Sequence, residues 1–88
     1  MLFRSYAAQL LGALYLEQGE IPKALHWLQA ALTLSPNHLA TQLNYCKALL
    51  QSGQKEQGLQ EASRLARAPE KSLADDAQAL LLAYGKAA

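Results

Sequence analysis

The sequence lacks a second cysteine: Cys46 is the only one among its 88 residues. No disulfide within one chain can therefore support the fold. Uninterrupted apolar stretches near the ~20 residues that a membrane span needs are also absent. About half of the residues are nevertheless hydrophobic, 51% by composition. We expect a soluble single domain over residues 1–88 whose stability depends on a dense core, since so short a chain buries a modest share of its surface.

An excess of charge of one sign is missing as well. Eight basic and seven acidic side chains leave a net charge of +1, and they are scattered along the chain. Nucleic-acid binding needs a clustered basic surface that neutralises phosphates. The sequence therefore predicts neither a nucleic-acid partner nor membrane insertion. It leaves the compartment open, with the cytoplasm favoured over the periplasm.

Patterns that carry catalysis or bind cofactors are also absent. His26 and His38 stand twelve residues apart without the close spacing of metal ligands. Asp75 and Asp76 are consecutive, so their side chains diverge on a helix and do not form a carboxylate pair. No glycine-rich phosphate loop or serine-histidine-acid arrangement occurs. We expect no metal, no cofactor and no enzymatic activity.

What the sequence does have is helical periodicity. Apolar residues recur at intervals of three and four, with Leu10, Leu11, Leu14 and Tyr15 as the first set. This periodicity also argues against reading residues 6–16 as a secretory signal. The pattern predicts about five helices, over residues 3–18, 22–34, 38–51, 55–68 and 73–86.

Residues typical of helix ends separate these segments. Gly19 and Gly53 can adopt the left-handed backbone that closes a helix, and Pro22 fits a first helical turn. Asn37 is placed to cap the third helix. Ser72, with Asp75 three residues later, has the spacing of a capping box and is expected to open the fifth.

The same pattern of residue types recurs thirty-four residues later. Leu11-Gly12-x2-Tyr15-x3-Gly19 reappears as Tyr45-Cys46-x2-Leu49-x3-Gly53. A repeat of this length indicates stacked helical hairpins. Cys46 takes the place of Gly12, which predicts a small thiol buried between helices rather than a reactive cysteine.

The first copy resembles the tetratricopeptide repeat (TPR) family. It reads Ala8-x2-Leu11-Gly12-x2-Tyr15, followed by Ala24-x3-Leu28, Ala31 and Pro36, with only the family's tryptophan and phenylalanine replaced. The second copy is weaker, and Pro69 comes one residue early, so we expect a less regular connection before the last helix. The resemblance implies an all-α, right-handed superhelix of antiparallel hairpins. Repeat one would span about residues 5–38, repeat two about 39–72, and a C-terminal helix about 73–86.

The resemblance further implies a concave groove formed by the first helix of each hairpin. The groove would present Tyr6, Gln9, Ala13, Leu16, Ala40, Leu43, Asn44, Lys47, Leu50, Gln78 and Leu82. This mostly apolar surface suits an amphipathic helix or an extended apolar segment of another protein. The family's clamp for C-terminal carboxylates is not predicted, because only Asn44 matches it, and Asp75 would put a negative charge where a lysine is needed.

Two functions stay open at this point. The first is an adaptor or scaffold module that binds a partner segment in the groove. The alternative is a structural or homo-oligomerisation segment whose terminal helices meet identical chains. A separate alternative concerns Tyr6, Leu16, Leu43 and Leu50, which a later helix of the same chain would cover in place of a partner. The apolar last helix also leads us to expect that the chain is part of a longer repeat protein.

Overall fold

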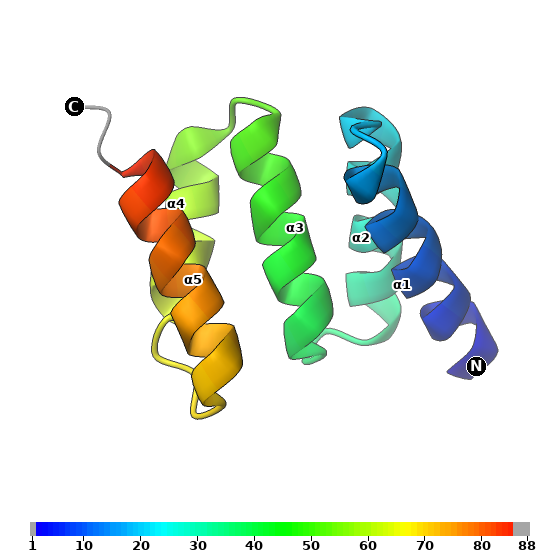
Figure 1. Cartoon of the computed structure of the whole chain (residues 1–88). Helices are drawn as coiled ribbons and strands as arrows, with labels where there is room; N and C mark the ends of the chain where they lie inside the picture. Colours follow the sequence, from blue (N-terminus) through cyan, green and yellow to red (C-terminus); the bar gives the residue numbers. More distant parts are fainter. Residues whose placement is uncertain (1, 86–88) are drawn as a thin grey trace.

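The computed structural model describes residues 2–85, with side chains from residue 4 onward, and this part of the chain contains helices and no strands. The elements are α1 (Leu2–Glu17), α2 (Ile21–Leu34), α3 (Leu39–Gln51), α4 (Lys55–Leu65) and α5 (Lys71–Tyr84). They form an elongated body of 40 × 28 × 18 Å. Helix α3 lies between the α1–α2 hairpin on one side and α4 and α5 on the other (Figure 1). The expected all-α fold of stacked hairpins is confirmed.

Both hairpins close with the same turn. Gly19 and Gly53 have positive φ angles of 78° and 90°, the left-handed conformation expected of them. The amide of Glu20 donates to the Tyr15 carbonyl at 2.9 Å, and thirty-four residues later Gln54 donates to Leu49 at the same distance. The repeat seen in the sequence is therefore a repeat of backbone geometry.

Close contact within each hairpin depends on a glycine. A Cβ atom added to Gly12 on α1 would lie 2.5 Å from a methyl group of Leu28 on α2. In the second hairpin, a Cβ atom on Gly58 of α4 would lie 2.6 Å from a methyl group of Leu50 on α3. Both leucines therefore pack directly against a partner backbone, which brings the two helices of each hairpin close together.

The core has two parts that meet at α3. One lies between α1, α2 and α3 and is built on Ala24, Leu28 and Ala48. The other joins α3, α4 and α5, and its buried members are Leu43, Cys46, Leu50, Ala62, Leu65, Leu73 and Ala77. Because α3 contributes to both, it links the two halves of the stack.

Two expected helix caps are wrong. Helix α3 is capped by His38 rather than Asn37, since the His38 Nδ1 atom accepts a hydrogen bond from the Thr41 amide at 3.3 Å. Helix α5 starts at Lys71, one residue before Ser72, and its N-cap residue Glu70 makes no side-chain cap. Asp75 instead pairs with Lys71 across one helical turn, with 3.1 Å between Nζ and Oδ2.

Helix α4 is shorter than expected. It ends at Leu65 rather than continuing to residue 68. The connection to α5 covers residues 66–70, one residue more than the 35–38 connection between α2 and α3. The irregular connection expected near Pro69 is present. Residue 86, the expected end of the last helix, lies outside the described residues.

Candidate protein-docking cleft

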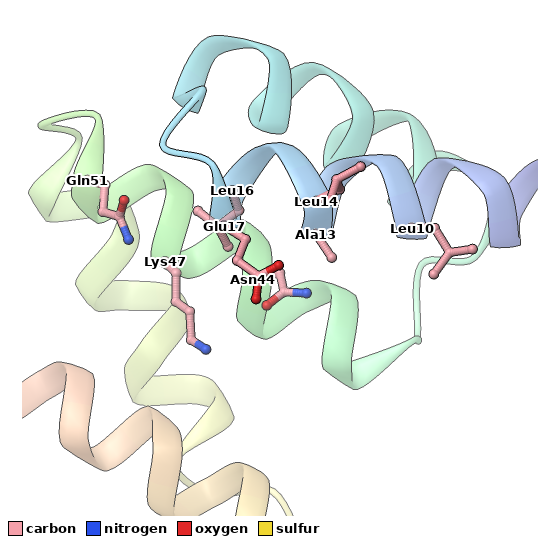
Figure 2. A pocket seen from close by; sticks show the side chains of 8 residues that line it. All are labelled: Leu10, Ala13, Leu14, Leu16, Glu17, Asn44, Lys47 and Gln51. Atoms are coloured by element: carbon pink, nitrogen blue, oxygen red, sulfur yellow. The ribbon is translucent and has the colours of Figure 1, made fainter.

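A cleft of about 540 Å³ opens between α1 and α3. Figure 2 shows that its lining side chains come from the C-terminal half of α1 and from one face of α3. The lining residues are Leu10, Ala13, Leu14, Leu16, Glu17, Asn44, Lys47 and Gln51. The two helices are the first members of their hairpins, and they run in the same direction (Figure 1).

The α1 wall is apolar and open to solvent. Leu10 and Leu14 are 52% and 48% exposed, and Tyr6, one turn earlier on the same ridge, is 59% exposed. These residues are spaced by four, so their side chains lie in one row on the helix. They point away from α2, because Ala8 and Gly12 on the opposite side of α1 are buried. A helix with apolar residues on both sides is normally covered on both.

The α3 wall is polar. Asn44, Lys47 and Gln51 are spaced by three and four residues and thus share one face of the helix. Among the described residues, none of these three side chains takes part in a hydrogen bond or an ion pair. The side chain of Glu17, the last residue of α1, is likewise without such a partner, and Figure 2 draws its carboxylate beside Asn44. The cleft therefore offers an ammonium group, two amides and a carboxylate beside an apolar wall.

The structure brings together part of the groove predicted from the sequence. Ala13, Leu16, Asn44 and Lys47 line the cleft. The remaining predicted residues lie elsewhere: Tyr6 is on the same ridge beyond the cleft, Gln9 is half-buried, and Ala40, Gln78 and Leu82 are exposed away from it. Gln9 donates a hydrogen bond to Ser5 at 3.1 Å.

Leu43 and Leu50 need a correction. They were expected to face a partner, but they are only 6% and 5% exposed and belong to the core between α3, α4 and α5. The later helices of the chain cover them, as the self-coverage alternative proposed. The other two residues in that alternative, Tyr6 and Leu16, are exposed and half-buried.

Four lining residues were missed from the sequence. Leu10 and Leu14 had been counted on the apolar side of the first helix, and Glu17 and Gln51 had been given no role. For Leu10 the repeat contained a usable signal, because Leu10 is the equivalent of Asn44, which the sequence analysis assigns to the groove. Glu17 and Gln51 are equivalent to each other, and no signal in the sequence indicated either.

Cys46 is fully buried in the α3–α4 contact, and its thiol donates to the Gly58 carbonyl at 3.1 Å. Burial raises the pKa of the Cys46 thiol to about 11, and the nearby Glu61 carboxylate adds to the increase. The thiol therefore stays protonated near neutral pH, which agrees with the structural role expected for it.

Within residues 2–85, no group of three or more histidine, cysteine, aspartate or glutamate side chains is placed to hold a metal ion. The same part of the chain contains no helix long and apolar enough to cross a membrane.

Comparison with known proteins identifies a family for this fold. A family model described as tetratricopeptide repeat matches residues 15–83. Searches of curated proteins and of solved structures gave no match. The matched segment starts near the end of α1 and includes all of α2, α3 and α4.

Proposed function

Because the chain belongs to the tetratricopeptide repeat family, which generally provides protein–protein interaction modules, we propose that it binds a segment of another protein in the cleft between α1 and α3. One observation carries the proposal. The cleft has a row of exposed large apolar side chains on one wall and polar groups without partners on the other. Members of this family are typically non-catalytic, and the adaptor role needs no chemistry beyond these contacts.

The exposed apolar row on α1 supports the proposal. Single exposed leucines are ordinary on a protein surface, but contiguous apolar patches mark interaction sites more often than not. Tyr6, Leu10 and Leu14 form such a row along one helix. A bound segment would remove it from water, at a gain of roughly 25 cal/mol for each Å² of apolar surface buried.

The proposal is tested by replacing Leu14 with glutamate in a tagged protein used for affinity capture. Leu14→Glu places a charge in the apolar wall and should remove the proteins captured by the wild type. Leu34→Glu is the matched control, because Leu34 is exposed to a similar extent, 45% against 48%, and does not line the cleft. Circular dichroism should show unchanged helix content in both variants.

Proteins that bind the wild type and Leu34→Glu equally, but not Leu14→Glu, would support the cleft as the docking site. Equal capture by all three proteins would contradict it. Loss of capture by both variants would also contradict it, since the interaction would then depend on exposed leucines in general.

The competing function is self-association through the terminal helices. Exposed apolar residues on both α1 and α5, with Leu82 60% exposed on the latter, favour it. Sedimentation equilibrium distinguishes the two functions. If the protein stays monomeric up to high micromolar concentration, self-association is too weak to be its function. A dimer that Leu82→Glu or Leu14→Glu converts to a monomer would support self-association.

A further inference from the structure

Helix α1 lies at the edge of the described stack and has an exposed side of its own (Figure 1). We infer that this side pairs with the same side of a second copy of the chain, as two antiparallel α1 helices related by a two-fold axis at Leu10. The pairing does not depend on the segment binding proposed above. It goes beyond self-association through terminal helices in general, because it assigns the helix, its orientation and its charged contacts. The exposed residues of α1, here called the α1 strip, are Arg4, Tyr6, Ala7, Leu10, Leu14 and Glu17.

The repeat shows that this side of a first helix is one that another helix covers. The equivalents of Ala7 and Leu14, thirty-four residues later, are Thr41 and Ala48 on α3. Thr41 and Ala48 are only 2% and 0% exposed, and Ala48 belongs to the core cluster that contains buried residues of α2. Among the described elements, α1 contacts α2 and α3 only, and Leu14 is 48% exposed. The α1 strip is thus an uncovered stacking surface.

The α1 strip is self-complementary in shape. Leu10 lies midway between Tyr6 and Leu14 in the sequence, and also midway between Ala7 and Ala13. In an antiparallel pair centred on Leu10, Tyr6 of each copy meets Leu14 of the other. The small side chains of Ala7 and Ala13 leave space on both sides for the central leucine of the other helix, as in knobs-into-holes packing. The same helix therefore supplies both the knob and the hole.

The charges of α1 favour a second copy in the antiparallel orientation. Arg4 and Glu17 are the charged residues of the described helix, one near each end, and neither forms an ion pair within the described residues. Their midpoint in the sequence falls next to Leu10. Arg4 of each copy would therefore lie about one residue, or ~1.5 Å along the axis, from Glu17 of the other. A dimer contains this contact twice because of its symmetry, whereas a parallel pair would bring like charges together.

The pairing has a consequence for the cleft. Leu10 and Leu14 belong to the α1 strip and also line the cleft. A paired α1 covers part of the apolar wall, so a second copy and a bound segment compete for the same leucines. One pair of helices is at the small end of specific interfaces, and we therefore expect a dimer that dissociates in the micromolar range.

Cysteine cross-linking tests the orientation of the two helices. Leu10→Cys places two thiols at the two-fold axis, where they can form a disulfide under mild oxidation. Leu14→Cys places them eight residues apart along the axis, about 12 Å, which is too far because the Cα atoms of a disulfide lie within about 7 Å. Leu34→Cys is the matched control, since Leu34 is 45% exposed against 52% for Leu10 and lies outside α1. Cys46 does not interfere because it is fully buried.

We expect Leu10→Cys to cross-link at least about tenfold faster than Leu14→Cys and Leu34→Cys, because the dimer raises the effective concentration of its thiols. Equal rates for Leu10→Cys and Leu34→Cys would indicate random collision and overturn the pairing. Fast cross-linking of both Leu10→Cys and Leu14→Cys would indicate a parallel pair and overturn the orientation.

Charge reversal tests the register. Arg4→Glu and Glu17→Arg each replace two attractions with two repulsions, so each should weaken the dimer about fivefold at low ionic strength. The double variant restores opposite charges and should return to within about twofold of the wild type. Sedimentation equilibrium measures the dissociation constants. Arg67→Glu and Glu56→Arg are the matched controls at exposed positions outside α1 and should leave the dimer unchanged.

A protein that stays monomeric up to high micromolar concentration would overturn the inference, as would a double charge reversal without recovery. A dimer that Leu82→Glu dissociates, and that the charge reversals in α1 leave intact, would assign the contact to α5 and also overturn it. The capture experiment separates these failures from failure of the proposed function. If the protein is monomeric and Leu14→Glu still abolishes capture, a partner of another kind covers the leucines and the proposed function stands.

Discussion

Gly12 with Leu28 and Cys46 with Ala62 are equivalent pairs of residues in the two hairpins. The larger side chain of the pair is on the second helix in the first hairpin and on the first helix in the second hairpin. Gly12 faces the large Leu28 in the first hairpin, whereas Cys46 and the small Ala62 take these places in the second. Leu28, Cys46 and Ala62 are completely buried. Packing at constant total volume is tolerated in protein cores, because what matters is that space is filled without strain.

This exchange predicts a compensating double mutant. Gly12→Cys alone should be destabilising by about 1–3 kcal/mol because it forces a side chain against Leu28, and Leu28→Ala alone should cost about 2–5 kcal/mol by leaving a cavity. The double variant copies the second hairpin and should be more stable than the sum of the single effects by at least ~1 kcal/mol. Urea unfolding of the four proteins measures this coupling, and strictly additive losses would show that the two positions do not share one space.

The buried thiol predicts a pH dependence at the alkaline side. Burial raises the pKa of the Cys46 thiol from its ordinary value of 9.0 to about 11 in the fold. Between these values the unfolded chain loses the thiol proton while the folded chain retains it. The contribution to stability is therefore present below pH 9 and decreases as the pH rises toward 11, by up to about 1.4 kcal/mol per pH unit.

Comparison with Cys46→Ala isolates this effect, because the two proteins differ only at this position. The free energy of unfolding of the wild type should fall more steeply than that of Cys46→Ala between pH 8.5 and about 10.5. Parallel pH profiles for the two proteins would mean that the thiol is not shielded in the folded state.

At the scale of a single helix, α3 depends on a histidine for its start. The His38 Nδ1 atom accepts from the Thr41 amide and lies 2.7 Å from the Thr41 hydroxyl oxygen. Helix starts leave several amides without partners, and a side chain that accepts from one of them stabilises the helix. The neighbouring Asn37 was the better candidate by residue type, but the chain enters the helix one residue later.

His38→Ala should lower the free energy of unfolding by about 0.5–2 kcal/mol, while Asn37→Ala should change it much less. His38→Asp offers a side-chain acceptor in the same place and should recover most of the loss. Thermal unfolding by circular dichroism is a sufficient measurement. A larger loss in Asn37→Ala than in His38→Ala would restore the cap that the sequence suggested.

Helix α1 differs from the others in having no polar side opposite its core. Between Tyr6 and Leu16, Gln9 is its only residue with a charged or amide side chain, and Gln9 bonds to the buried Ser5. The exposed row of α1 is thus a property of the whole element, and it is what makes the cleft apolar on one side.

For the molecule as a whole, α3 is the element on which both halves depend. It contacts α1 and α2 through one side and α4 and α5 through another. In a stack of this kind each unit is stabilised mainly by its neighbours. A mutation on the buried faces of α3 should therefore affect the entire fold, whereas one on its cleft face should not.

Leu43→Glu and Leu14→Glu test this distinction. Leu43 is buried between α3, α4 and α5, so a glutamate there would be an unpaired buried charge and should reduce helix content and thermal stability strongly. Leu14→Glu should leave both close to wild type, since Leu14 is half exposed. Similar far-ultraviolet spectra and melting temperatures for the two variants would contradict the burial of Leu43.

The fold was largely predictable because it depends on local signals that repeat. The left-handed turns expected at Gly19 and Gly53 are present, and the period of thirty-four predicts the hairpins. The site was predicted only in part. Position in the repeat placed Ala13 and Lys47 on the cleft, but it placed Leu43 and Leu50 there as well.

The sequence by itself determined the helices, their turns and the small residues at which they meet, because helix periodicity, glycine conformation and side-chain volume act between residues close in the chain. Only the tertiary structure decided which apolar side chains are covered. Leu50 is buried and Leu16, its equivalent, lines the cleft, because α3 lies between two neighbours while α1 lies at the edge of the described stack. Burial depends on what packs against a residue from elsewhere in the chain, and repeat position does not carry that information.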